Sequence, residues 1–344
     1  MKKIKWFLFV CFTLPSFLAS AQNALIDSVK FFSDEGVIEM TLSTDIKKLQ
    51  DKKSIEAYQP ADITLKMPDG TSYAEQIRLF ARGKSRRENC LIPPIMLNFR
   101  NNSSPKLKSL GKVKLVVGCG SSDIDEQLVL KEYTIYKIYN LLEEKSFRAR
   151  LVHVTYTDSK GKMKPITQYS YILEDVDDMA ERNGCVTEGK KMSFQIEETD
   201  PVLMNKVDIF EYMIANIDWS VPANHNIKVI FPKDDVSAKG WTVPYDFDNA
   251  GLVNAYYATP NELLGATSVT ERIYRGFPRK IELIQGNLAL FEKQKENILS
   301  LVRNFELLKP KTKSEMVDYI NSFYKIIGDK NQVQNVFILN ARKE

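Results

Sequence analysis

Histidine, cysteine, glycine and proline are all scarce in this chain of 344 residues. It has 2 His, 4 Cys, 15 Gly and 14 Pro. With two histidines and no CxxC pair, a zinc site built from His and Cys is not expected. The low Gly and Pro counts argue against collagen-like sequence and low-complexity linkers. No GxxxxGK[ST] motif occurs either, so the chain lacks a Walker-type phosphate loop.

Excess positive charge is also nearly absent once the N-terminus is set aside. The formal net charge is +4, and Lys2, Lys3 and Lys5 supply three of these charges. They precede an apolar stretch over residues 6–18 and the small residues 19–21. This pattern predicts a secretory signal peptide over residues 1–21 and export to the periplasm, the cell surface or the medium.

The predicted mature chain is close to neutral. Without the three leader lysines, 45 basic residues remain against 44 acidic ones, a net charge of +1. A protein that binds nucleic acid or an anionic membrane usually concentrates basic charge. We therefore expect no nucleic-acid partner, and no stable membrane span after the signal peptide is removed.

Three cysteines remain after that cleavage, namely Cys90, Cys119 and Cys185. Exported proteins meet an oxidising compartment, so one disulfide and one free thiol are expected. The preferred pair is Cys90–Cys119, which would join two strand-like segments. The alternative is three buried free cysteines.

The first half of the chain alternates apolar and polar residues as strands do. Turn residues separate these runs at short intervals, as in an antiparallel sheet. A helical period interrupts them over residues 123–145. The strands are expected over residues 37–42, 61–67, 76–82, 95–99, 113–117, 150–157 and 168–173.

The second half reads mainly as helix. Apolar residues spaced by three and four predict helices over residues 202–217, 279–303 and 313–327. Residues 226–231 and 241–243 predict the two strands of a short hairpin. The fold class expected is therefore α+β, with a β-rich part over residues 22–173 and a helical part over residues 174–344.

The densest group of polar residues surrounds that hairpin. Asp218 follows a predicted helix, Asn226 opens the first strand, and Asp246 and Asp248 close the second. A hairpin brings its two ends together, so these side chains could converge on one pocket. Carboxylate and amide oxygens suit Mg²⁺ or Mn²⁺. The alternative is that each Asp is only a cap or turn residue.

This layout parallels the catalytic end of a protein kinase. There an Asp accepts the proton of the substrate hydroxyl, an Asn contacts magnesium, and a second magnesium-binding Asp follows. In this sequence Asp218 and Asn226 are eight positions apart, which is longer than the common kinase loop.

Several segments, taken in order, resemble the CotH (spore coat protein H) family of secreted atypical kinases. The resemblance runs from Arg78 to Gly251, about half of the chain, and rests on the order of its motifs. Those motifs are residues 77–85, 130–133, 171–177, 216–218, 225–226 and 244–248. The resemblance implies a bilobal atypical protein-kinase-like fold, with a β-rich N-lobe holding one long helix and a mainly helical C-lobe. It also implies ATP with Mg²⁺ or Mn²⁺ as cofactors and phosphate transfer to a protein outside the cytoplasm.

The same resemblance assigns roles by position. Asp218 matches the catalytic Asp, Asn226 and Asp246 match metal ligands, and Asp248 is a possible helper. Glu174 falls in the hinge where adenine would bind. The remaining assignments concern the cation that would contact phosphate. In the family, a Glu at the position of Glu132 would pair with a strand lysine, but residues 93–96 hold no lysine where the family usually has one. The cation is therefore expected from Arg82, Lys84, Arg86 or Lys114.

Two further functions remain open. One is a catalytically degenerate pseudokinase that serves as a binding module at the cell surface. The other is a carbohydrate-active hydrolase using two of Asp218, Asp246 and Asp248, because a glycosidase needs two carboxyl groups across a sugar cleft. The aromatic residues Tyr245, Phe247, Tyr256 and Tyr257 could line such a cleft.

Overall fold

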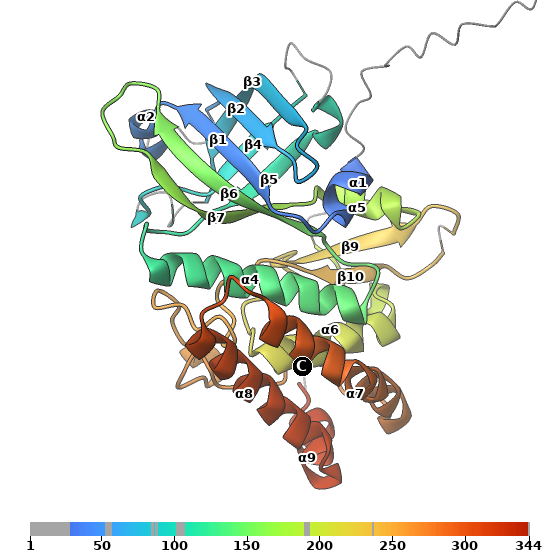
Figure 1. Ribbon diagram of the computed structural model, residues 1–344. Helices are drawn as coiled ribbons and strands as arrows, with labels where there is room; N and C mark the ends of the chain where they lie inside the picture. The colour runs from blue at the N-terminus through green and yellow to red at the C-terminus, as the bar shows by residue number, and fades with distance from the viewer. Residues whose placement is uncertain are drawn as a thin grey trace, which may run out of the picture.

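The computed structural model describes residues 28–51, 57–83, 86, 89–100, 107–188, 193–235 and 237–342. The predicted signal peptide over residues 1–21 and the expected phosphate-binding residue Lys84 lie outside these residues. A strand-rich part and a helical part are stacked, with the long helix α4 (Asp123–Leu142) running between them (Figure 1).

The seven strands of the first part close into a barrel in the order β1-β2-β3-β4-β5-β7-β6. Neighbours pair antiparallel, except that β1 and β6 pair in parallel and close the barrel. Alternate side chains point into a core that the barrel encloses. The strands are β1 (Ile38–Thr44), β2 (Gln59–Lys66), β3 (Ser72–Ala81), β4 (Ile95–Asn98), β5 (Lys112–Val116), β6 (Ala149–Asp158) and β7 (Ile166–Leu173).

The closed barrel corrects the expected fold class. A bilobal kinase-like fold with a sheet-rich N-lobe is wrong, because β1 and β6 pair from Ile38↔Val152 to Thr44↔Asp158 and join the sheet into a barrel. Closure satisfies the backbone groups that an open sheet would leave at its edges. The predicted strand positions themselves are confirmed.

Helix α4 begins at a capping box, in which the Ser122 hydroxyl accepts from the Asp125 amide and the Asp125 carboxylate accepts from the Ser122 amide. Most of its side chains are buried, since it packs against β6 and β7 on one side and α7 on the other. Its position confirms the predicted helix over residues 123–145. The helix lies between the barrel and the helical part (Figure 1).

The helical part contains the three longer helices that the sequence predicts. They are α6 (Pro201–Ile214), α7 (Ile281–Asn304) and α8 (Pro310–Ile327). A small sheet of order β10-β9-β8 accompanies them, and its β9–β10 pair is the predicted hairpin. The remaining elements with bounds are α1 (Ser28–Ser33), α2 (Ile46–Gln50), α5 (Val176–Arg182), α9 (Lys330–Gln334), β8 (Cys185–Thr187), β9 (Ile227–Pro232) and β10 (Trp241–Pro244).

Cys90 and Cys119 form a disulfide, and Cys185 is a buried free cysteine, as predicted. The disulfide joins the segment before β4 to the segment after β5.

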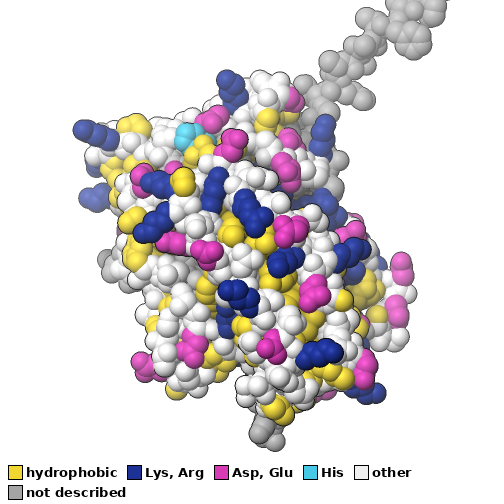
Figure 2. Space-filling view, turned by 60° about the horizontal axis from the view of Figure 1, so that its bottom comes forward, with side chains coloured by type: hydrophobic (Ala, Val, Ile, Leu, Met, Phe, Trp, Pro, Cys, Tyr) yellow, Lys and Arg dark blue, Asp and Glu magenta, His cyan; other side chains and the backbone are white. Residues whose placement is uncertain are grey.

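Within the described part of the chain, no helix is both long and apolar enough to cross a bilayer. On the face in Figure 2, basic and acidic side chains are interspersed, without a large patch of one sign.

Candidate functional site

A cleft of about 520 Å³ lies where the barrel meets the hairpin of the helical part. Its barrel side comes from the ends of β3 and β5 and the segment before β4, and its other side from residues next to β9 and β10. The lining residues are Arg82, Gly83, Arg86, Asn89, Cys90, Pro94, Val116, Cys119, His225, Asp246, Asp248, Asn249 and Tyr257.

The hairpin brings its two ends together as the sequence predicts. The Tyr245 amide donates to the Asn226 carbonyl at 3.0 Å, so the residue before β9 lies beside the residue after β10. Asn226 and Asp246 both have left-handed backbones, with φ of 53° and 65°. Non-glycine residues in this region carry strain, which is often found where a side chain must be aimed at a functional site.

Helix α4 fixes the backbone of residues 246–248, the acidic segment, through two hydrogen bonds. The Asp246 amide donates to the Tyr136 hydroxyl at 2.8 Å, and the Phe247 amide donates to Glu132 Oε1 at 3.2 Å. Tyr136 and Glu132 are four residues apart and so share one face of the helix. The backbone of the acidic segment is therefore fixed to the element that joins the barrel and the helical part.

The Asp218 carboxylate is the centre of a hydrogen-bonded group. His225 Nε2 lies 2.9 Å from Oδ1, while Nδ2 of Asn226 and Nδ2 of Asn249 lie 3.3 and 3.2 Å from Oδ2. Asn226 Nδ2 also donates to the Asp218 carbonyl at 2.7 Å. The Asp218 side chain is still 42% exposed, so a bound molecule could reach it.

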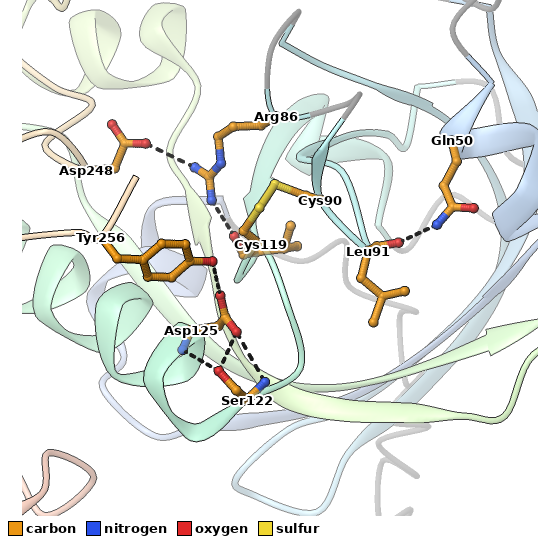
Figure 3. Close-up of a disulfide and its surroundings, with 10 residues drawn as sticks. Gln50, Arg86, Cys90, Leu91, Cys119, Ser122, Asp125, Asp248 and Tyr256 are labelled. Atoms are coloured by element: carbon orange, nitrogen blue, oxygen red, sulfur yellow. Dashed lines mark hydrogen bonds and ion pairs between the residues drawn. A yellow bond between two sulfur atoms is a disulfide. The ribbon is translucent and has the colours of Figure 1, made fainter. Parts of the chain in front are cut away.

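Asp248 is paired with Arg86 across the cleft. Arg86 Nη1 lies 3.3 Å from Asp248 Oδ2, and Nη2 donates to the Val117 carbonyl at 2.7 Å. Figure 3 shows the guanidinium between Asp248 and the disulfide of Cys90 and Cys119. The Arg86 carbonyl accepts from the Cys90 amide at 2.9 Å, so the disulfide anchors the segment that carries this cation.

Carboxylates are in excess on this side of the cleft. Burial, followed by the nearby charge of Asp246, raises the pKa of Asp248 to about 6, although Arg86 opposes the shift. Burial and the charges of Asp248 and Asp246 also raise the pKa of Glu132. Arg86 alone does not compensate three crowded carboxyl groups.

Unlike Arg86, two cations on the barrel side have no carboxylate partner in the described part of the chain. Among the described residues, neither the Arg82 guanidinium nor the Lys114 ammonium forms a hydrogen bond or ion pair. Lys114 Nζ lies instead 4.5 Å from the centre of the Tyr245 ring. Burial, with the charge of Arg82 next, lowers the pKa of Lys114 to about 8. Burial also lowers the pKa of Arg82, while Asp246 opposes this shift.

An apolar platform adjoins these cations on the outer face of β3, β4 and β5. The strand register places Phe80 beside Met96, and Met96 beside Lys114. All three side chains are half-buried. The next row towards the cleft contains Arg82, whose amide donates to the Pro94 carbonyl at 2.7 Å.

The structure brings most of the predicted site residues together. Asp218, Asn226, Asp246 and Asp248 meet at the hairpin, and the charge of Asp246 acts on both Arg82 and Lys114. Glu132 lies behind the hairpin, where it holds the Phe247 amide instead of a strand lysine.

Glu174 does not join this group. Its carboxylate is 2% exposed and pairs with Arg182, with both nitrogen–oxygen distances at 2.9 Å. It also accepts from the Arg148 amide at 3.0 Å. Its side chain is therefore occupied in fixing the chain after β7 to α5.

Sequence reasoning missed the contributions of Asn249 and Tyr136. Asn249 directly follows the acidic run and could have been included by its position. For Tyr136, no local pattern indicates that its hydroxyl accepts from the Asp246 amide. Arg86 appeared only as one of four possible cations, and the structure singles it out by its pairing with Asp248.

In the part of the chain that the structure describes, no group of three or more His, Cys, Asp and Glu side chains is arranged to hold a metal ion.

No protein-family model matches the sequence, and the curated proteins contain no match to it.

Proposed function

We propose that the cleft binds a nucleoside triphosphate with a divalent cation and transfers its terminal phosphate to a hydroxyl group of a protein. The observation that carries this proposal is the charge difference between the two sides. Among the described residues, Arg82 and Lys114 have no carboxylate partner on the barrel side, and Asp246 and Asp248 crowd the opposite side. A metal–phosphate group would satisfy both sides at once.

The platform beside the cations supports a nucleotide rather than inorganic phosphate. Ligand sites combine apolar surface with a few placed polar groups. Phe80 and Met96 offer an apolar surface on which a flat base could pack, next to the ammonium of Lys114. Charge-assisted hydrogen bonds from Lys114 and Arg82 would then hold phosphate oxygens.

The oxygen ligands near the hairpin fit a metal shared with the substrate. Mg²⁺ is commonly bound by one or two protein carboxylates together with substrate phosphates and water, not by a complete protein cage. Asp246 and Asp248 would supply the carboxylates and Asn226 the amide oxygen. The cation would neutralise charge that develops on the phosphate oxygens.

Asp218 has the contacts expected of a general base. The substrate hydroxyl oxygen would bond to the terminal phosphorus while the bond from that phosphorus to the bridging oxygen breaks, and a nucleoside diphosphate would leave. The hydroxyl proton would pass to the Asp218 carboxylate. His225, Asn226 and Asn249 hold that carboxylate in one orientation.

The test is transfer of labelled terminal phosphate from ATP with Mg²⁺ or Mn²⁺, to protein mixtures and to the protein itself. We expect transfer by the wild type, none by Asp218→Asn, and unchanged transfer by Asp235→Asn, a surface carboxylate at the far end of the same hairpin. Nucleotide binding without any transfer would overturn the catalytic proposal and favour a pseudokinase binding module. Stabilisation by oligosaccharides and not by nucleotide would favour the hydrolase.

We also propose that the protein acts outside the cytoplasm on a protein substrate or cell-surface partner. The leader pattern over residues 1–21 and the Cys90–Cys119 disulfide support this proposal. N-terminal sequencing of protein from the native cells should begin at Gln22. A chain that keeps Met1 in the cytoplasmic fraction would contradict export.

A further inference from the structure

One arginine from a distant segment holds the backbone on both sides of Asp218. Arg275 Nη1 donates to the Ile217 carbonyl at 2.6 Å and also to the Trp219 carbonyl. The guanidinium lies over the Trp219 ring, 4.9 Å from its centre. The two carbonyls that flank the proposed general base are therefore fixed by a single side chain.

Helix α6 supports the same backbone from the other direction. The Asn216 amide donates to the Glu211 carbonyl at 2.8 Å, and Asn216 Oδ1 accepts from the Asp218 amide at 3.1 Å. The Glu211 carboxyl group is buried, and its charge opposes the lowering of the Arg275 pKa. Arg275 thus interacts electrostatically with a buried acidic group and donates hydrogen bonds to the Asp218 loop.

A second arginine, three residues earlier, makes similar contacts elsewhere. Arg272 donates to the Met213 and Tyr319 carbonyls and to the Ser322 hydroxyl, and its guanidinium lies 3.9 Å from the centre of the Tyr319 ring. Burial lowers the pKa of both arginines. Arg272 fixes the segment to α6 and α8, whereas Arg275 fixes it to the Asp218 loop.

The structure assigns to Arg275 the role of a positioning residue that sets the place of the Asp218 carboxylate in the cleft. The expected effect on the rate of phosphate transfer rests on the proposed function. The expected effect on the order of the Asp218 loop rests only on the hydrogen bonds. Misplacing a catalytic group by about 1 Å can lower the rate about 100-fold. Because Arg275 does not line the cleft, its loss should affect the chemical step more than nucleotide binding.

The experiment compares Arg275→Met and Arg275→Lys with Arg272→Met as the matched control. We expect Arg275→Met to lower kcat about 100-fold with a nearly unchanged KM for ATP. Arg275→Lys should recover part of that loss, because an ammonium can still donate to one carbonyl. Arg272→Met should keep the wild-type kcat, although both Met variants should unfold at lower temperature than the wild type.

Amide hydrogen exchange gives a readout that does not depend on activity. The Asp218 and Ser220 amides should exchange faster in Arg275→Met than in Arg272→Met. If the wild type transfers no phosphate, the proposed function fails and exchange still decides whether Arg275 orders the loop. Equal loss of kcat in both Met variants, or equal exchange at Asp218, would overturn the inference and leave the proposed function standing.

Discussion

The two sides of the cleft differ in how their charges are satisfied. On the hairpin side, the Asp218 carboxylate accepts hydrogen bonds from Asn226 and Asn249, and Asp248 forms an ion pair with Arg86 of the barrel side. On the barrel side, Arg82 and Lys114 form neither with the described residues. Burying a charge without a partner costs free energy, so these cations weaken the fold. Under the proposed function, the ligand would satisfy these two cations, whereas the Asp218 carboxylate is already held in place by its neighbours.

Loss of the disulfide should have the largest effect on this arrangement, because it anchors the segment that carries Arg86. The double variant Cys90→Ser/Cys119→Ser should lose about 3 kcal/mol of unfolding free energy, since the disulfide restricts the unfolded chain. Denaturant titration measures this loss. Cys185→Ser, which removes only the buried free thiol, is the control. An equal loss in both variants would show that the disulfide does not anchor the barrel side.

Removing one carboxylate from the hairpin side should have the next largest effect. Asp246→Asn keeps the shape of the residue and its left-handed backbone but removes a negative charge. Metal-dependent nucleotide affinity should fall about 100-fold, at the upper end of the effects seen when groups around a metal are changed. Calorimetric titration measures it, with Asp235→Asn as the control. Unchanged affinity in Asp246→Asn would contradict the metal assignment.

Removing a cation from the barrel side should weaken binding and strengthen the fold. Lys114→Met should lower nucleotide affinity about tenfold, as expected for one charge-assisted contact. Its melting temperature should nevertheless rise at pH 7, because a buried ammonium without a partner is lost. Lys66→Met, at an exposed position of β2, should change neither quantity. Loss of stability in Lys114→Met would show that this lysine serves the fold instead.

The same lysine should shape the pH dependence of stability. Burial lowers the pKa of Lys114 from 10.5 to about 8, so the folded state releases this proton before the unfolded state does. The free energy of unfolding should therefore gain a rising contribution between about pH 8 and pH 10.5. Lys114→Met should lack it, and denaturant titrations across this range would detect the difference. An identical pH dependence in the variant would contradict the assignment.

The smallest effect concerns a buried acid on α6, away from the cleft. Burial raises the pKa of Asp208 from 3.8 to about 8, although Arg279 and Arg275 oppose the shift. The stability contributed by this group is complete below pH 3.8 and falls as the pH rises towards 8. Asp208→Asn should reduce that decline and raise the free energy of unfolding at pH 8 relative to the wild type. Asp318→Asn, on the exposed face of α8, is the control, and a steeper decline in Asp208→Asn would contradict the account.

Local patterns in the sequence were sufficient for the barrel strands, the four longest helices, the hairpin and the grouping of polar residues around it. The strands, α4 and the hairpin follow from periodicity, and convergence of Asp218, Asn226 and Asp246 follows from the geometry of a hairpin. The disulfide between Cys90 and Cys119 follows from their positions near neighbouring strands.

Contacts between distant segments were beyond the reach of such patterns. Closure of the barrel depends on parallel pairing of β1 with β6, which neither strand signals by its own alternation. Glu174 looks like a hinge residue by its position in the sequence, but its carboxylate forms an ion pair with Arg182. The contact of Arg275 with the Asp218 loop joins residues more than fifty positions apart and has no local signature.

Calorimetric titration of ATP into the purified, oxidised protein, with and without Mg²⁺, tests most directly whether both sides of the cleft hold one ligand. Saturable binding should occur with Mg²⁺ and weaken strongly when the metal is chelated, and it should be lost in the Lys114→Met/Asp246→Asn double variant. No binding by the wild type, or equal affinity with and without metal, would contradict the account.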